Sequence, residues 1–116
     1  METQNAVGAL SALAHASRLE IFRLLVQAGP EGMAAGDVAR ATGILANTLS
    51  TNLNILAAAG LVTSRREGRS IIYSAGYDAM RELLAFLMED CCASRAEICA
   101  PLAPSLAKPD RPRPQT

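Results

Sequence analysis

The chain has 116 residues, half of them apolar, with 11 Lys and Arg against 11 Asp and Glu, one His, three Cys and no Trp. A chain of this size supports one hydrophobic core and not two, and its apolar runs are far shorter than the roughly 20 residues that a membrane helix needs. Zero net charge argues against a generally basic nucleic-acid binder. Because the N-terminus lacks a basic signal segment, we expect a single domain located in the cytoplasm.

Helical periodicity dominates the first part of the chain. A first amphipathic helix is predicted from apolar residues spaced by three and four, namely Ala6, Val7, Leu10, Leu13 and Ala14. Ser17 and Glu20 have the spacing of a capping box, which predicts the start of a second helix, and Gly29 with Pro30 predicts its end.

Two further short helices are predicted in the middle of the chain. The first covers Asp37–Thr42 and ends at Gly43; the second covers Asn47–Ala59 and has Gly60 as its C-terminal cap. The core face of the second helix consists of Leu49, Leu53 and Leu56. Two short helices joined by a turn that contains glycine form a helix-turn-helix.

A β-hairpin and a last helix follow. Leu61–Arg66 and Arg69–Ser74 are rich in β-forming residues, and Glu67 with Gly68 suits a two-residue turn between them. From Tyr77 the helical period returns, with Met80, Leu83, Leu84, Leu87, Met88 and Cys91 on one face. The predicted fold is therefore mainly α with a β-hairpin, a winged helix-turn-helix over residues 1–102. Prolines at 101, 104, 109, 112 and 114 predict a mobile tail over residues 103–116.

The predicted recognition helix presents hydrogen-bonding side chains to DNA. Helical projection places Asn47, Thr51 and Asn54 opposite the leucines, with Thr48 and Ser50 on the flanks. No Lys or Arg lies on this helix, so the strongest base-reading contact, from Arg to guanine, is missing. We expect modest sequence specificity from this helix; the alternative is that Thr48 and Ser50 only cap or solvate it.

The positive charge lies in the hairpin. Arg65, Arg66 and Arg69 fall within five residues around the turn, where they suit contact with phosphate or with a narrow minor groove. Phosphate contacts position a protein on DNA without selecting a sequence. A plain solvated turn is the alternative interpretation.

The chain has three cysteines, and they span nine residues near its C-terminal end: Cys91, Cys92 and Cys99. Three soft sulfur donors without a neighbouring histidine favour a three-coordinate thiophilic ion such as trivalent arsenic or antimony, whereas zinc requires a fourth ligand. One ion can bind all three only if the helix ends and the chain turns back, because Cys91 and Cys99 would lie about 12 Å apart along a continuous helix. A redox pair and inert packing thiols are the alternatives.

These residues resemble the ArsR/SmtB family of metal-responsive winged-helix repressors over about residues 5–100. The resemblance rests on residues 13–19, on residues 47–50 with Leu53, Leu56 and residues 59–62, on Ile71–Tyr73 at the end of the wing, and on residues 89–92 with Cys99. The closing segment is similar to arsenite-sensing members that carry cysteines at the end of the last helix. Residues 33–38 lack the cysteine pair of other arsenite sensors, and residues 79–90 lack the histidines of zinc sensors.

The resemblance implies a homodimer built from the first and last helices. It further implies a repressor, not an enzyme, that binds the operator of an arsenic-resistance operon and is released when arsenite, or antimonite, binds Cys91, Cys92 and Cys99. Two other functions stay open. A redox-responsive regulator would pair Cys99 oxidatively with Cys91 or Cys92, and a dimeric interaction module would use the wing arginines on an acidic protein.

Overall fold

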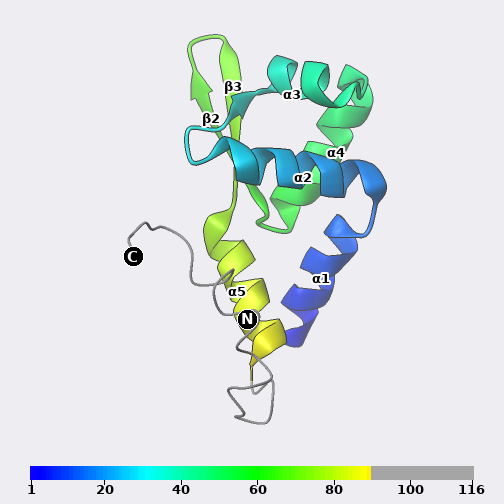
Figure 1. Cartoon of the computed structure of the whole chain (residues 1–116), viewed down its shortest axis with the longest axis vertical. Coiled ribbons are helices and arrows are strands. Elements are labelled where there is room, and N and C mark those ends of the chain that lie inside the picture. Colours follow the sequence, from blue (N-terminus) through cyan, green and yellow to red (C-terminus); the bar gives the residue numbers. More distant parts are fainter. Residues whose placement is uncertain (90–116) are drawn as a thin grey trace. The chain divides into compact units, whose positions relative to one another are not determined.

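The structure, a computed structural model, describes residues 1–89. Its elements follow in the order α1 (Thr3–Leu13), α2 (Ala16–Ala28), β1 (Met33–Ala34), α3 (Ala35–Thr42), α4 (Ala46–Ala58), β2 (Val62–Glu67), β3 (Ser70–Ala75) and α5 (Tyr77–Met88) (Figure 1). The predicted winged helix-turn-helix is confirmed. Cys91, Cys92, Cys99 and the predicted proline-rich tail lie outside the described residues.

Helix α1 turns a face of small residues to the core. Ala6, Ala9 and Ala12 are buried, whereas Val7 and Leu10 from the predicted apolar stripe are 57% and 42% exposed. Alanines let the backbone of α1 approach its neighbours closely, which leaves the larger side chains on the outer face. Both α1 and α5 thus expose apolar surface, since Leu84 is also exposed.

The start of α2 differs from the prediction. The helix begins at Ala16, and the ring nitrogen Nδ1 of His15 accepts a hydrogen bond of 3.2 Å from the backbone N–H of Ser17. Ser17 therefore lies inside the first turn and is not the N-cap, so the predicted capping box with Glu20 is wrong. The predicted helix ends at Gly29 and Gly43 are confirmed, since both residues are C-caps. Helix α4 ends one residue earlier than predicted, with Ala59 as its C-cap and Gly60 after it.

The hairpin belongs to a three-stranded antiparallel sheet with the strand order β1-β3-β2. Strand β1 was not predicted, because its two residues are too few to show a period; it pairs with Ile72 and Tyr73 of β3. Glu67 pairs with Ser70, so the turn consists of Gly68 and Arg69, one residue later than predicted. Gly68 has φ 62°, a backbone angle that two-residue hairpin loops favour and that glycine adopts without strain.

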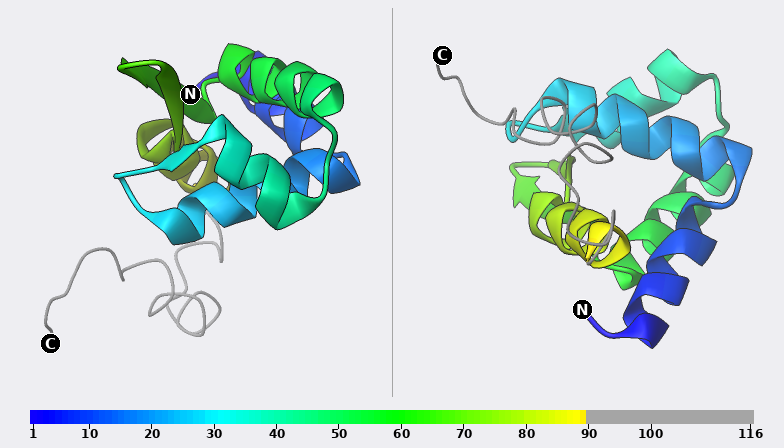
Figure 2. Two further views of the ribbon diagram at one scale, coloured as in Figure 1. Left: turned by 90° about the horizontal axis from the view of Figure 1, so that it is seen from above. Right: turned by 60° about the horizontal axis from the view of Figure 1, so that its bottom comes forward.

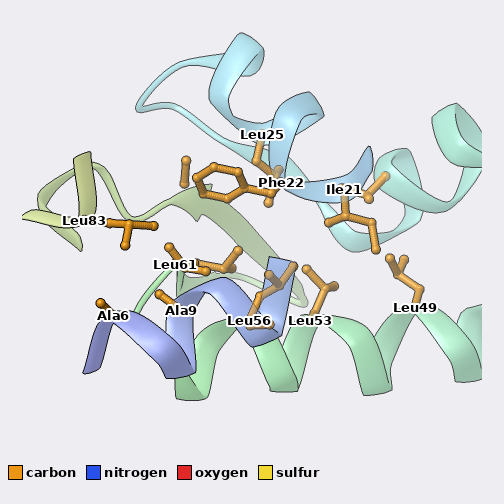
Figure 3. Packing of buried hydrophobic residues seen from close by; sticks show 14 residues of the cluster. Ala6, Ala9, Ile21, Phe22, Leu25, Leu49, Leu53, Leu56, Leu61 and Leu83 are labelled. Carbon is orange, nitrogen blue, oxygen red and sulfur yellow. The ribbon is translucent and has the colours of Figure 1, made fainter. Parts of the chain in front are cut away.

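The core lies between α2 and α4 (Figure 3). Ile21 and Leu25 of α2 face Leu53 and Leu56 of α4, and all four side chains are at most 1% exposed. Other buried members come from α3, the residue before β2, the first residue of β2 and α5, namely Val38, Leu61, Val62 and Leu83. Burying side chains of this size contributes about 1.5–3 kcal/mol each, so the packing fixes which face of α4 is left outside.

Helix α5 starts against the end of α4. The N–H of Gly76 donates to the carbonyl of Leu61 at 2.7 Å, and a Cβ at Gly76 would lie 2.2 Å from the carbonyl oxygen of Gly60. Only glycine permits this approach. One residue later, the Tyr77 hydroxyl donates to the carbonyl of Val26 at 3.1 Å, which joins α5 to the last turn of α2.

Replacing Tyr77 with Phe is expected to lower the free energy of unfolding by about 0.5–1.5 kcal/mol at neutral pH, the net contribution of one hydrogen bond. Burial, and then the negative charge of Glu31, raise the pKa of the Tyr77 hydroxyl above 10.0. The unfolded chain therefore loses this proton first, so this contribution to stability is complete below pH 10 and falls as the pH rises further.

Thermal unfolding between pH 7 and pH 11 checks this expectation. The wild-type protein should lose more stability above pH 10 than Tyr77→Phe, so that the two curves converge. Tyr73→Phe is the matched control, because the Tyr73 hydroxyl makes no hydrogen bond within residues 1–89. Parallel curves for wild type and Tyr77→Phe would contradict the proposed role of the hydroxyl.

Candidate nucleic-acid interface

The outer face of α4 carries the side chains predicted to read DNA. Leu49, Leu53 and Leu56 are buried. The five predicted DNA-contacting residues of this helix are all exposed, namely Asn47, Thr48, Ser50, Thr51 and Asn54. The Thr51 hydroxyl donates to the carbonyl of Asn47 at 3.2 Å, so it can offer DNA an acceptor only. Within residues 1–89 the amides of Asn47 and Asn54 make no hydrogen bond and can both donate and accept.

The three arginines of the wing are not equivalent. Strand alternation places Arg65, which pairs with Ile72, on one face of the hairpin and Arg66, which pairs with Ile71, on the other. Arg65 donates from Nη2 to the carbonyl of Glu31 and from Nε to the carboxylate of Glu67, each at 2.7 Å. It therefore fastens the wing to the loop after α2.

Of the three wing arginines, Arg66 and Arg69 are available to bind a ligand. Neither makes an ion pair or side-chain hydrogen bond within the described part of the chain, and both are exposed. Arg69 lies in the turn itself. The sequence predicts that all three arginines contact phosphate or a narrow minor groove, whereas the geometry leaves two of them without a partner among residues 1–89.

The wing and the N-terminal end of α4 lie at the same edge of the molecule. The hairpin turn and the start of α4 are both at the top in Figure 1, whereas α1 and residues 77–86 of α5 are at the bottom. Seen from that edge, α3 and α4 lie beside the hairpin (Figure 2, left). A single duplex at this edge can therefore lie against both the start of α4 and the hairpin turn.

A partly buried polar link joins α1 to the middle of α4. Arg18 of α2 donates from Nε to the carbonyl of Ala12 at 2.6 Å and from Nη1 to Oδ1 of Asn52 at 3.3 Å. Asn52 is only 4% exposed, and its Nδ2 has no partner within the described residues. Sequence reasoning missed this pair, because no local pattern connects residues 34 positions apart. Arg18 therefore holds the end of α1 and the recognition helix in a defined relation.

Replacing Arg18 with Met is expected to lower the free energy of unfolding by about 1–3 kcal/mol, because Oδ1 of buried Asn52 loses its donor. Adding Asn52→Leu should restore part of that stability, because removing both polar partners costs less free energy than leaving one of them buried without a hydrogen bond. Urea unfolding of both single variants and the double variant measures the coupling. Arg23→Met, an exposed position on the same helix, is the control. Strictly additive losses would show that the two side chains do not interact.

The predicted thiol site, formed by Cys91, Cys92 and Cys99, lies outside the described residues 1–89. Among residues 1–89 no group of three or more His, Cys, Asp and Glu side chains is arranged to hold a metal ion. In the same part of the chain no helix is long and apolar enough to cross a membrane.

Comparison with known proteins assigns the family. A helix-turn-helix domain family matches residues 13–65. The nodulation protein NolR of Rhizobium meliloti is 38% identical over 88 residues, which cover 76% of this chain and 70% of NolR. Reduced HlyU from Vibrio cholerae is similar in structure, with a TM-score of 0.59, 30% identity and coverage of 73% of this chain and 90% of HlyU.

A third relative carries the family name. The homodimeric winged helix-turn-helix DNA-binding domain of Mb0332 from Mycobacterium bovis, described as a possible ArsR-family transcriptional regulator, aligns with a TM-score of 0.61 and 30% identity over 84% of each chain. The expectation that the protein is not an enzyme agrees with this relative, which is described as a transcriptional regulator. Fold, exposed recognition helix and sequence identity together show that the chain belongs to the ArsR family of DNA-binding winged helix-turn-helix transcriptional regulators.

Proposed function

We propose that this regulator is a homodimeric repressor of an arsenic-resistance operon, released from its operator when trivalent arsenic, or antimony, binds Cys91, Cys92 and Cys99. One observation carries the proposal. All three cysteines of the chain fall within nine residues, and the first of them follows the end of α5 at Met88 by three residues. An ion bound there acts directly on the end of that helix.

The outer faces of α1 and α5 support the dimer. Val7, Leu10 and Leu84 are large apolar side chains, each more than a third exposed, on the two helices that lie away from the hairpin turn. Burying them against a second copy would contribute roughly 25 cal/mol for each Å² of apolar surface removed from water. The Mb0332 domain is itself a homodimer.

The donor set fits a three-coordinate thiophilic ion. When arsenous acid reacts with thiols, each As–O bond is replaced by an As–S bond and one water is released, so the reaction consumes no oxidant. Zinc would need a fourth ligand. The only histidine, His15, uses Nδ1 to cap α2, which removes that nitrogen from the available donors.

The contacts of α4 support a route from the thiols to DNA. Gly76, directly before α5, donates to the carbonyl of Leu61, two residues after the C-cap of α4, and α1 is linked to the middle of α4 through Arg18. Any shift of the dimer helices thus moves α4 and changes the spacing of the two recognition helices. The ion must bind the DNA-free conformation more tightly, with a coupling of about 1–3 kcal/mol.

A redox-responsive repressor is the second candidate, and the similarity to HlyU, of which a reduced form is known, favours keeping it. In this case Cys99 and either Cys91 or Cys92 lose two protons and two electrons to an oxidant such as hydrogen peroxide, which is reduced to water, and one disulfide forms. The disulfide would then alter the end of α5.

Fluorescence anisotropy of the protein on its own promoter duplex separates these functions. We expect salt-dependent binding under strong reductant, and release by arsenite under the same conditions. Release by peroxide alone, with no effect of arsenite, would refute the arsenic proposal and support the redox regulator. No salt-dependent duplex binding at all would refute both and favour the protein interaction module.

A further inference from the structure

Leu45 is the most exposed large apolar residue in the described part of the chain, with 78% of its surface accessible. It is the N-cap of α4: its backbone is extended, and its carbonyl accepts the N–H of Leu49 at 2.8 Å. Its side chain cannot cap the helix, and none of the free N–H groups at the start of α4 gains a side-chain partner from it.

Neither local stability nor the proposed dimer accounts for a leucine at this position. Ser, Thr, Asp and Asn stabilise a helix at the N-cap, whereas Leu does not, and a side chain this exposed gains little from burial. The proposed dimer does not cover it either, because within residues 1–86 α1 and the described start of α5 lie at the end opposite the start of α4 (Figure 1). A ligand that binds at the edge formed by the hairpin turn and the start of α4 would bury the Leu45 side chain.

We propose that Leu45 is a specificity-determining residue that packs against the 5-methyl group of a thymine in the major groove. The inference rests on the proposed function, in which α4 enters that groove. Residues at the start of a recognition helix reach the base edges, and thymine alone presents a methyl group there. Leu45 immediately precedes the exposed polar residues of α4, including Asn47 and Thr48.

The chemistry of α4 makes this contact informative. Because the helix carries no Lys or Arg, its direct readout is limited to amides, hydroxyls and apolar contacts. A hydroxyl such as that of Thr48 or Ser50 can serve as donor or acceptor and discriminates bases weakly. An apolar contact that excludes water from one thymine methyl therefore adds selectivity for an A·T pair in each half-site.

Removing the methyl group from the DNA tests the proposal. High-affinity duplexes are first selected with the full-length protein from a randomised library, and each thymine is then replaced in turn by deoxyuridine. We expect wild-type affinity to fall about fourfold for one thymine in each half-site, the effect of one methyl group removed from an apolar contact. Leu45→Ser should bind the thymine and deoxyuridine duplexes equally.

Two controls keep a loss of folding apart from a loss of readout. Leu45→Ser should raise the thermal midpoint by about 5 °C, because a serine side chain can accept a hydrogen bond from the first N–H groups of α4 and a leucine side chain cannot. Leu19→Ser, at an exposed leucine on α2, should keep the full deoxyuridine penalty. An unchanged wild-type affinity at every thymine, or an equal penalty in Leu45→Ser, would overturn the role of Leu45. Failure of the wild-type protein to select any duplex would instead overturn the proposed function itself.

Discussion

Replacing Arg66 and Arg69 together with Gln is expected to weaken binding to every duplex by about two to three orders of magnitude at 0.1 M salt. Each phosphate contact releases about 0.9 counterion, so the four charges removed from a homodimer should reduce the slope of log affinity against log salt by about 3 to 4. Sequence preference should be unchanged, because phosphate contacts position the protein without reading bases.

Arg65→Gln is the matched control for this prediction. Its guanidinium donates to the carbonyl of Glu31 and the carboxylate of Glu67, so Arg65 should contribute less to the salt dependence of DNA binding than Arg66 or Arg69. Anisotropy titrations at four salt concentrations measure all three slopes. An unchanged slope in Arg66→Gln/Arg69→Gln would place the phosphate contacts on another surface, and an equal loss in Arg65→Gln would mean that its hydrogen bonds give way to DNA.

Replacing Cys91, Cys92 or Cys99 singly with Ser is expected to abolish, or greatly weaken, release by arsenite while DNA affinity stays within about threefold of wild type. A serine hydroxyl keeps the size of the thiol but is a hard donor, so arsenic is left with two sulfur ligands and the three-thiol site no longer closes around one atom. Allosteric coupling typically changes affinity 5- to 150-fold, and the factor by which arsenite changes DNA affinity should thus fall to about one.

Ser94→Ala is the control, because it changes a neighbouring side chain without removing a sulfur. DNA affinity with and without arsenite, under strong reductant, gives the coupling for each variant. Loss of DNA binding in all three cysteine variants would refute the separation of sensing from DNA contact. A full arsenite response in any one of them would show that its sulfur is not required.

The helices that a core face defines were predictable from the sequence. Leu49, Leu53 and Leu56 repeat with the period of a helix, and burial of that face alone leaves Asn47 and Asn54 outside. Elements that depend on distant partners were not predictable. Strand β1 exists only because two residues meet β3 some 40 positions later, and the cap on α2 comes from His15, a residue type without a strong preference for that position.

The candidate interface shows the same division between local and distant signals. Clustering of three arginines is visible in the sequence, but the contact of Arg65 with the carbonyl of Glu31 depends on how the hairpin packs beside the loop after α2. In α1, the apolar spacing suited Val7 and Leu10 as well as Ala6, and only packing decides that the alanines face inward. The link between Arg18 and Asn52 likewise requires the assembled fold.

The central claim is that occupancy of the three thiols and loss of DNA binding are one event. Fully reduced wild-type protein, bound to labelled promoter duplex, is titrated with arsenite while ultraviolet sulfur-to-arsenic absorption and fluorescence anisotropy are followed in the same sample. We predict that both signals change together and reach their end points at one arsenic per protomer. Saturation of the sulfur-to-arsenic absorption with the anisotropy unchanged would contradict the account.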